Sequence, residues 1–71
     1  MIKQVSQSEA EKIFGKYGIT VLMWRDSSIQ TDQYDGMICD YSKLPGYKVK
    51  YACEIWDMKS QKQVERFNVM R

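Results

Sequence analysis

The chain has 71 residues, of which 44% are hydrophobic and 28% are charged, and these values are typical of a folded domain rather than a disordered segment. This length allows one domain, residues 1–71, with a thin core. The net charge of +2 is too small to indicate a polyanionic partner, and no apolar run approaches the ~20 residues of a membrane span. We therefore expect a cytoplasmic protein that does not insert into a membrane.

The first predicted element is a helix over residues 7–17. Ser6 and Glu9 have the spacing of a capping box, in which each side chain bonds a free backbone amide at the start of the helix. Gly18 follows at the position where many helices end in the left-handed conformation. The apolar residues recur at helical spacing and form one stripe: Ala10, Ile13, Phe14 and Tyr17.

The stretch ITVLMWR is apolar and rich in β-branched residues, which predicts a strand over residues 19–25 that is partly covered on both sides. The polar stretch DSSIQTDQYDG predicts a loop over residues 26–36, long enough to be a candidate for mobility or binding. Asp26, Asp32 and Asp35 lie in this loop, but their spacing matches no calcium-binding loop. We favour turn formation over a cation site, because Asp side chains bond their own backbone in turns.

Three more strands are predicted in the second half of the chain. Residues 37–42 and residues 47–57 form a hairpin, with Pro45 and Gly46 suited to the central positions of a type II turn between them. Side chains alternate between two faces along the second of these strands. The final stretch QVERFNVM predicts a strand over residues 63–70, although the spacing of its apolar residues also fits a helix.

The last two strands have a preferred register, because one alignment keeps the apolar residues together on one face. It pairs Cys53 with Phe67 and Tyr51 with Val69 on the inner face, and Glu54 with Arg66 and Trp56 with Val64 on the outer face. The predicted fold is α+β, with one N-terminal helix packed on a four-stranded antiparallel β-meander. The predicted core contains apolar residues of the helix and of the inner strand faces: Ile13, Phe14, Tyr17, Val21, Ile38, Val49, Tyr51, Cys53, Ile55, Phe67 and Val69.

The chain contains no histidine and two cysteines, Cys39 and Cys53. Histidine is the commonest general base, and an apolar strand raises the pKa of a thiol, so we expect no catalytic residue. We predict that both thiols are reduced and buried, and we expect no metal or cofactor because the cysteines lack zinc-ligand spacing. A helix-turn-helix would need a recognition helix at residues 20–28, which β-branched and aromatic residues disfavour.

Positive charge is concentrated in residues 37–71, which carry a net charge of +3, whereas residues 1–36 carry −1. On the outer face of the predicted hairpin, Trp56 shares its side of the sheet with four charged residues: Lys48, Lys50, Glu54 and Arg66. Trp and Arg dominate the hot spots of protein interfaces, whereas aromatic residues beside cations also bind single-stranded nucleic acid. A third interpretation is that Trp56 only covers hydrophobic surface, beside lysines that protect the sheet against aggregation.

We predict a small non-enzymatic protein-interaction module that binds and modulates a larger protein partner. The alternative is a small β-sheet protein that binds single-stranded nucleic acid. The length and architecture are typical of accessory proteins of bacteria and their phages, an association that rests on size alone. A thin core and two unpaired sheet edges also predict a homodimer, which would cover the most weakly covered apolar residues: Met23, Trp24, Trp56 and Met70.

Overall fold

The computed structural model describes residues 2–71, and it confirms the helix predicted for residues 7–17 as α1 (Gln7–Lys16). The helix begins at Ser6, whose backbone is extended and whose hydroxyl accepts a hydrogen bond from the amide of Glu9 at 3.2 Å. This bond satisfies one of the amides that have no partner within the first turn, which is why the helix starts at this serine.

The C-terminal end of α1 turns the chain back toward the sheet. Gly18 adopts a φ of 76°, which residues with a side chain rarely accept. The amides of Gly18 and Ile19 donate to the carbonyls of Gly15 and Phe14, each at 3.0 Å. These two bonds form a Schellman motif, as expected for a helix that ends at a glycine.

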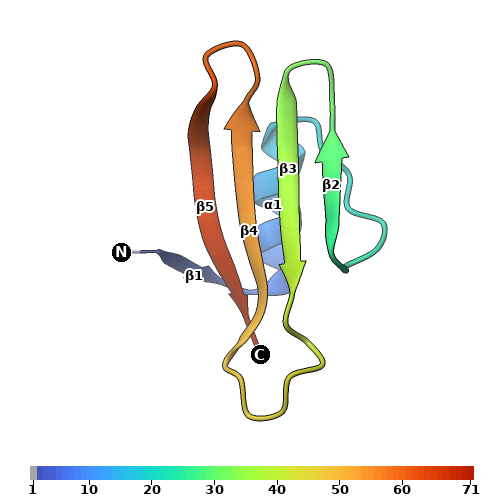
Figure 1. Ribbon diagram of the computed structural model, residues 1–71, viewed down its shortest axis with the longest axis vertical. Coiled ribbons are helices and arrows are strands. Elements are labelled where there is room, and N and C mark those ends of the chain that lie inside the picture. Colours follow the sequence, from blue (N-terminus) through green and yellow to red (C-terminus); the bar gives the residue numbers. More distant parts are fainter. Residues whose placement is uncertain (1) are drawn as a thin grey trace.

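The strands form one five-stranded sheet in the order β1-β5-β4-β3-β2. Their bounds are β1 (Lys3–Val5), β2 (Ser27–Gln30), β3 (Tyr34–Asp40), β4 (Val49–Asp57) and β5 (Lys62–Met70). β1 is parallel to β5, and all other neighbours are antiparallel. Figure 1 shows α1 behind one face of the sheet, while no helix covers the face toward the viewer. We call this uncovered side the open face.

The predicted class, α+β with one helix, is confirmed, but the four-stranded antiparallel meander is wrong. The sheet is mixed because β1 adds to the edge of β5, with Lys3 beside Phe67 and Val5 beside Val69. A strand of three residues is too short to show the alternation that reveals strands in a sequence. Its partner also lies at the far end of the chain, so no local turn indicates the pairing.

The strand predicted for residues 19–25 is wrong, since this segment forms no ladder with any strand. The segment is nevertheless part of the fold. Ile19 is buried, and the ring of Trp24 packs 4.8 Å from that of Tyr51, measured between centroids. The segment therefore covers the same side of the sheet as α1, and its β-branched residues serve packing rather than strand pairing. Leu22, by contrast, is 87% exposed.

The loop predicted for residues 26–36 is also wrong in large part, because it contains β2 and the start of β3. The turn between these strands is tight: the Thr31 hydroxyl accepts a hydrogen bond from the amide of Tyr34 at 2.9 Å. β2 carries a single large apolar residue, Ile29, so its sequence shows no apolar alternation. It is recognisable only from its pairing with β3.

Strands predicted at residues 37–42, 47–57 and 63–70 are confirmed as β3, β4 and β5, with shifted ends. The last segment is a strand and not a helix. Its register against β4 agrees with the prediction at three pairs: Tyr51 with Val69, Cys53 with Phe67, and Glu54 with Arg66. The fourth predicted pair is wrong, because Val64 is the extra residue of a β-bulge and Trp56 lies opposite Gln63.

The connection between β3 and β4 contains the predicted type II turn. Gly46 has a φ of 74°, and the amide of Tyr47 donates to the Leu44 carbonyl at 3.3 Å. Arg71 holds this connection from the other end of the chain. Its guanidinium donates at 2.6 to 3.3 Å to three carbonyls, those of Tyr41, Ser42 and Leu44.

The core lies between the sheet and the layer formed by α1 and the segment after it. Its buried residues are Val5, Ala10, Ile13, Phe14, Ile19, Ile38, Tyr51, Cys53, Ile55, Phe67 and Val69. Tyr17 and Val21 were predicted to be buried but only partly are, and Val49 is half-buried at the end of β4. The predicted core does not include Val5 or Ile19. Val5 lies in β1, which the sequence does not predict, and Ile19 lies in a segment predicted to be a strand that forms no ladder.

The two cysteines lie on opposite sides of the sheet and form no disulfide. Cys53 is buried in the core, as predicted, and burial raises the pKa of its thiol to about 12. Cys39 is exposed on β3, so the prediction that both thiols are buried is wrong for this residue. The adjacent residue Ile38, not Cys39, lies opposite Cys53, and alternation therefore turns Cys39 to the open face.

Candidate binding face

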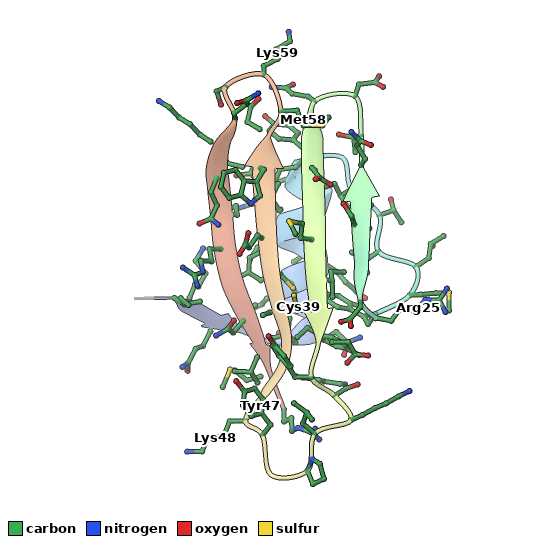
Figure 2. All side chains as sticks on the ribbon, viewed as in Figure 1. Arg25, Cys39, Tyr47, Lys48, Met58 and Lys59 are labelled. Carbon is green, nitrogen blue, oxygen red and sulfur yellow. The ribbon has the colours of Figure 1, made fainter. Side chains whose placement is uncertain are left out.

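The residues predicted to form one binding surface lie at opposite ends of the sheet. Lys48 precedes β4, whereas Trp56 is the second-last residue of that strand. Eight residues of extended strand span roughly 26 Å. Figure 2 shows Lys48 and Tyr47 at one end of the molecule, and Met58 and Lys59 at the other. A single contact site cannot include both Lys48 and Trp56 unless the partner covers the length of the sheet.

Lys50 does not face the open side at all. A β-bulge between Val49 and Tyr51 leaves Lys50 without a partner on β5. Its Nζ donates to Gln7 Oε1 of α1 at 3.2 Å and lies 5.5 Å from the ring centroid of Tyr51. The alternation expected from the sequence fails at this bulge, so Lys50 joins the helix to the sheet instead of contributing to the open face.

Trp56, Glu54 and Arg66 do lie together, but the contacts between them differ from those expected. Glu54 stands opposite Arg66 in the ladder, yet no ion pair joins them within 4.0 Å. Instead, the indole Nε1 of Trp56 donates to Glu54 Oε2 at 2.8 Å. The carboxylate thus fixes the position of the indole, and the Arg66 side chain stays exposed on the open face.

Trp56 lies in a shallow hollow of about 560 Å³ at the end of the open face nearest the β4–β5 turn. We call it the Trp56 hollow. Its lining comes from β3, β4 and the β4–β5 turn: Asp35, Met37, Trp56, Asp57, Met58 and Gln61. Asp35 is the direct ladder partner of Trp56, so the two residues stand side by side on neighbouring strands.

Hydrogen bonds hold the walls of the hollow in place. Asp35 Oδ1 accepts from the Ser28 hydroxyl at 2.7 Å, which ties β3 to the edge strand β2. Asp57 Oδ1 accepts from two backbone amides of the β4–β5 turn at 2.9 and 3.3 Å. The Met58 sulfur lies 3.0 Å from the side-chain amide of Gln30, so β2 supports this wall as well.

The lining combines apolar surface with negative charge. Met37 and Met58 supply flexible thioethers, while Asp35 and Asp57 supply carboxylates. No lysine or arginine lines the hollow. Cations follow in the next part of the chain: Lys59 lies in the β4–β5 turn, Lys62 begins β5, and Arg66 lies further along β5.

A smaller hollow of about 190 Å³ continues along the open face and shares Met37 with the first. Arg66 and the exposed Cys39 lie here, beside Ala52 and Asn68. The open face is therefore acidic and methionine-rich around Trp56, and Arg66 is the one cation among the described residues that lines either of these two hollows. The predicted binding residues do not include Asp35, Met37 or Met58. Asp35 falls in the predicted loop at residues 26–36, and the two methionines belong to no recognisable sequence motif.

The three aspartates considered as a cation site do not come together. Asp26 accepts a hydrogen bond from the amide of Asp40, whereas Asp35 binds Ser28 on the open face. Within residues 2–71, no three His, Cys, Asp or Glu side chains are close enough to hold a metal ion.

In the same part of the chain, no helix has the length and apolar character needed to cross a membrane. No family model, no curated protein and no solved structure matches this chain.

Proposed function

We propose that this chain is a small non-enzymatic module whose open face binds a larger protein partner through Trp56. The observation that carries this proposal is the setting of Trp56: half-buried, lining one hollow together with two methionines, on the side of the sheet that no helix covers. Tryptophan is the residue most enriched in interface hot spots, and methionine adapts its shape to a partner. The bond to Glu54 holds the indole in one position, which lowers the entropic cost of binding.

The acidic lining supports a protein partner over nucleic acid. A surface that binds single-stranded nucleic acid places cations beside its stacking aromatics. Trp56 has Asp35 opposite it and Glu54 bonded to its indole, and both would repel phosphates. Lys48 and Lys50, which supported the alternative, lie away from the Trp56 hollow.

The test is an affinity capture from cells of the native host, with the wild-type chain and the Trp56→Ala variant as parallel baits. Proteins retained by the wild type and lost by the variant, identified by mass spectrometry, are then purified for direct binding measurements. Val64→Ala is the matched control, because Val64 is an exposed apolar residue near Trp56 outside the hollow. A set of captured proteins that is identical for both baits would show that Trp56 is not the binding residue.

A nucleic-acid function would show itself in a separate measurement. Binding of single-stranded oligonucleotides should be weak, and Trp56→Ala should not change it. An affinity that falls steeply with salt and depends on Trp56 would instead establish the alternative, because released counterions make phosphate binding strongly salt-dependent.

The same proposal includes a homodimer in the cytoplasm. Leu22 and Met23 are 87% and 57% exposed, and they lie in the segment that precedes the edge strand β2. Exposed apolar residues beside an unpaired strand edge favour association with a second copy. Sedimentation at high micromolar concentration tests this: a strictly monomeric mass would contradict it.

A further inference from the structure

The Trp56 hollow has a chemical character that defines what it can bind. Two of its six lining residues are carboxylates and none is a cation, while the rest of the surface comes from an indole, two thioethers and an amide. An apolar hollow with fixed negative charges is complementary to a side chain that has an apolar stem and a cationic end.

We infer that the Trp56 hollow receives an arginine or lysine side chain of the partner protein, held between the face of the Trp56 indole and the carboxylate of Asp35, with Asp57 as a second negative charge in the lining. This inference rests on the proposed function and specifies the chemistry of its partner. A cation over the face of tryptophan is attracted by the ring quadrupole, and tryptophan is the strongest of the aromatic residues in this contact.

The hydrogen bonds of the lining leave acceptors for such a cation. Asp35 and Asp57 each bond through Oδ1, and no hydrogen bond among the described side chains uses the second oxygen of either carboxylate. The indole N–H is already bonded to Glu54, so the ring does not need a further acceptor from the partner. An incoming guanidinium whose plane lies against the ring can therefore donate to the free oxygen of Asp35.

Among the described residues, no cation of the chain forms an ion pair with Asp35 or Asp57. Lys62 is the ladder partner of Asp57, yet no ion pair within 4.0 Å joins them. Arg66 lines the second hollow and not the first. Among the described residues, the one ion pair is between Lys3 and Glu65, on the side of the sheet that carries α1. The Trp56 hollow thus keeps its negative charge available for a partner.

The test begins with a random peptide library displayed on phage, selected against the wild-type chain and depleted against Trp56→Ala. We expect the selected peptides to share an arginine or lysine next to apolar residues. Synthetic versions of one peptide are then compared, with its cation kept or replaced by citrulline, which has the shape of arginine without its charge. The charged form should bind about tenfold more tightly or better, as expected for a cation that contacts an indole and carboxylates together.

Variants of the chain provide the second readout. Asp35→Asn should weaken binding of the arginine peptide severalfold, because it removes one charge but keeps an acceptor for Ser28. Glu9→Gln is the control, since Glu9 lies on α1 on the covered side of the sheet and its loss should leave the affinity unchanged. Amide NMR spectra of each variant confirm that the fold is retained.

The possible failures are distinct. Selected peptides that depend on Trp56 but lack a cation, or bind equally well with citrulline, would overturn the inference while the proposed function stands. An unchanged affinity in Asp35→Asn would overturn it as well. If no selected peptide distinguishes the wild type from Trp56→Ala, both the inference and the proposed role of the open face fail.

Discussion

The indole N–H of Trp56 donates to Glu54 Oε2 at 2.8 Å, two residues earlier on the same strand. Both side chains point to the open face, because residues two apart on a strand share a side. Glu54 therefore acts on its neighbour along β4, and not on Arg66 across the ladder. This contact gives the open face an indole that is fixed in position and has negative charge at its edge.

Replacing Glu54 by lysine tests the sign of the charge that the open face prefers. Glu54→Lys adds two units of positive charge beside the Trp56 hollow and removes the acceptor of the indole N–H. Binding of a cation-bearing protein partner should weaken by roughly tenfold or more, because like charges then meet in the interface. Calorimetric titration at two salt concentrations measures this. Tighter binding of oligonucleotides with a steeper salt dependence would instead indicate a nucleic-acid function.

The two tryptophans should differ in their contribution to stability. Trp24 packs on Phe14 and Tyr51 at centroid distances of 6.1 and 4.8 Å, whereas Trp56 lies on the uncovered face. We expect Trp24→Ala to lower the free energy of unfolding by about 2–3 kcal/mol and Trp56→Ala by less than about 1 kcal/mol. Urea unfolding followed by circular dichroism measures both. A Trp56→Ala variant that unfolds would show that this residue belongs to the core.

Thiol reactivity should separate the two cysteines. Cys39 is exposed, whereas Cys53 is buried with the pKa of its thiol raised to about 12, so that its reactive thiolate is scarce at neutral pH. A thiol reagent should label one site rapidly in the folded protein and the second only after denaturation. Cys39→Ser should remove the rapid phase. Two rapid sites in the folded wild type would be inconsistent with the buried position of Cys53.

Alkaline pH should weaken the contact between α1 and β5. Tyr17 donates its hydroxyl to Glu65 Oε2 at 2.9 Å, and the pKa of Tyr17 lies above its ordinary value of 10.0, first through burial and second through this bond. A raised folded-state pKa means that the stabilisation is complete below pH 10 and is lost as pH rises through the folded-state pKa.

Tyr17→Phe should therefore cost about 1 kcal/mol at neutral pH, the value of one hydrogen bond, and should lose less stability than the wild type above pH 10. Some alkaline loss should persist in the variant, because burial also raises the pKa of Tyr51. Unfolding measured in urea at neutral and alkaline pH gives both quantities. Parallel pH curves for the two proteins would rule out a role for Tyr17.

Asp40 is expected to contribute to stability at the acidic end. Hydrogen bonds from Ser42, first from its side chain and then from its amide at 2.8 Å, hold the pKa of Asp40 below its ordinary 3.8. A lowered folded-state pKa stabilises the protein above pH 3.8, and this contribution is lost as pH falls through the folded-state pKa. Carbon-13 NMR titration should show the pKa of Asp40 rising in Ser42→Ala and rising less in Lys43→Gln. Equal shifts would argue against the hydroxyl as the main cause.

The parts of the fold that were predictable from the sequence are those with a strong local signal. The cap at Ser6 and the glycine at position 18 mark the ends of α1, and the alignment of apolar residues fixes most of the register between β4 and β5. The bulge at Val64 was not predictable, since an extra residue on one strand leaves the apolar pattern of the other unchanged.

The sequence-based prediction is wrong for segments whose secondary structure depends on partners elsewhere in the chain. The segment at residues 19–25 has the composition of a strand but lies over the core without a neighbouring strand to pair with. The sequence of β2 is polar and not typical of a strand, yet this segment is a strand because its backbone pairs with the edge of β3. The Trp56 hollow was not predictable for a related reason: Asp35 lies opposite Trp56 because β3 begins at Tyr34, inside the segment predicted to be a loop.

The parallel pairing of β1 with β5 also determines when the fold can be completed. Val5 pairs beside Val69, so this part of the sheet joins residues that are separated by nearly the whole chain. Closing so long a loop is slow and costs entropy before the contact forms, whereas the β3–β4 and β4–β5 hairpins close locally. During synthesis the first strand must therefore wait for the last one to emerge, and the antiparallel hairpins provide the edge on which it finally docks.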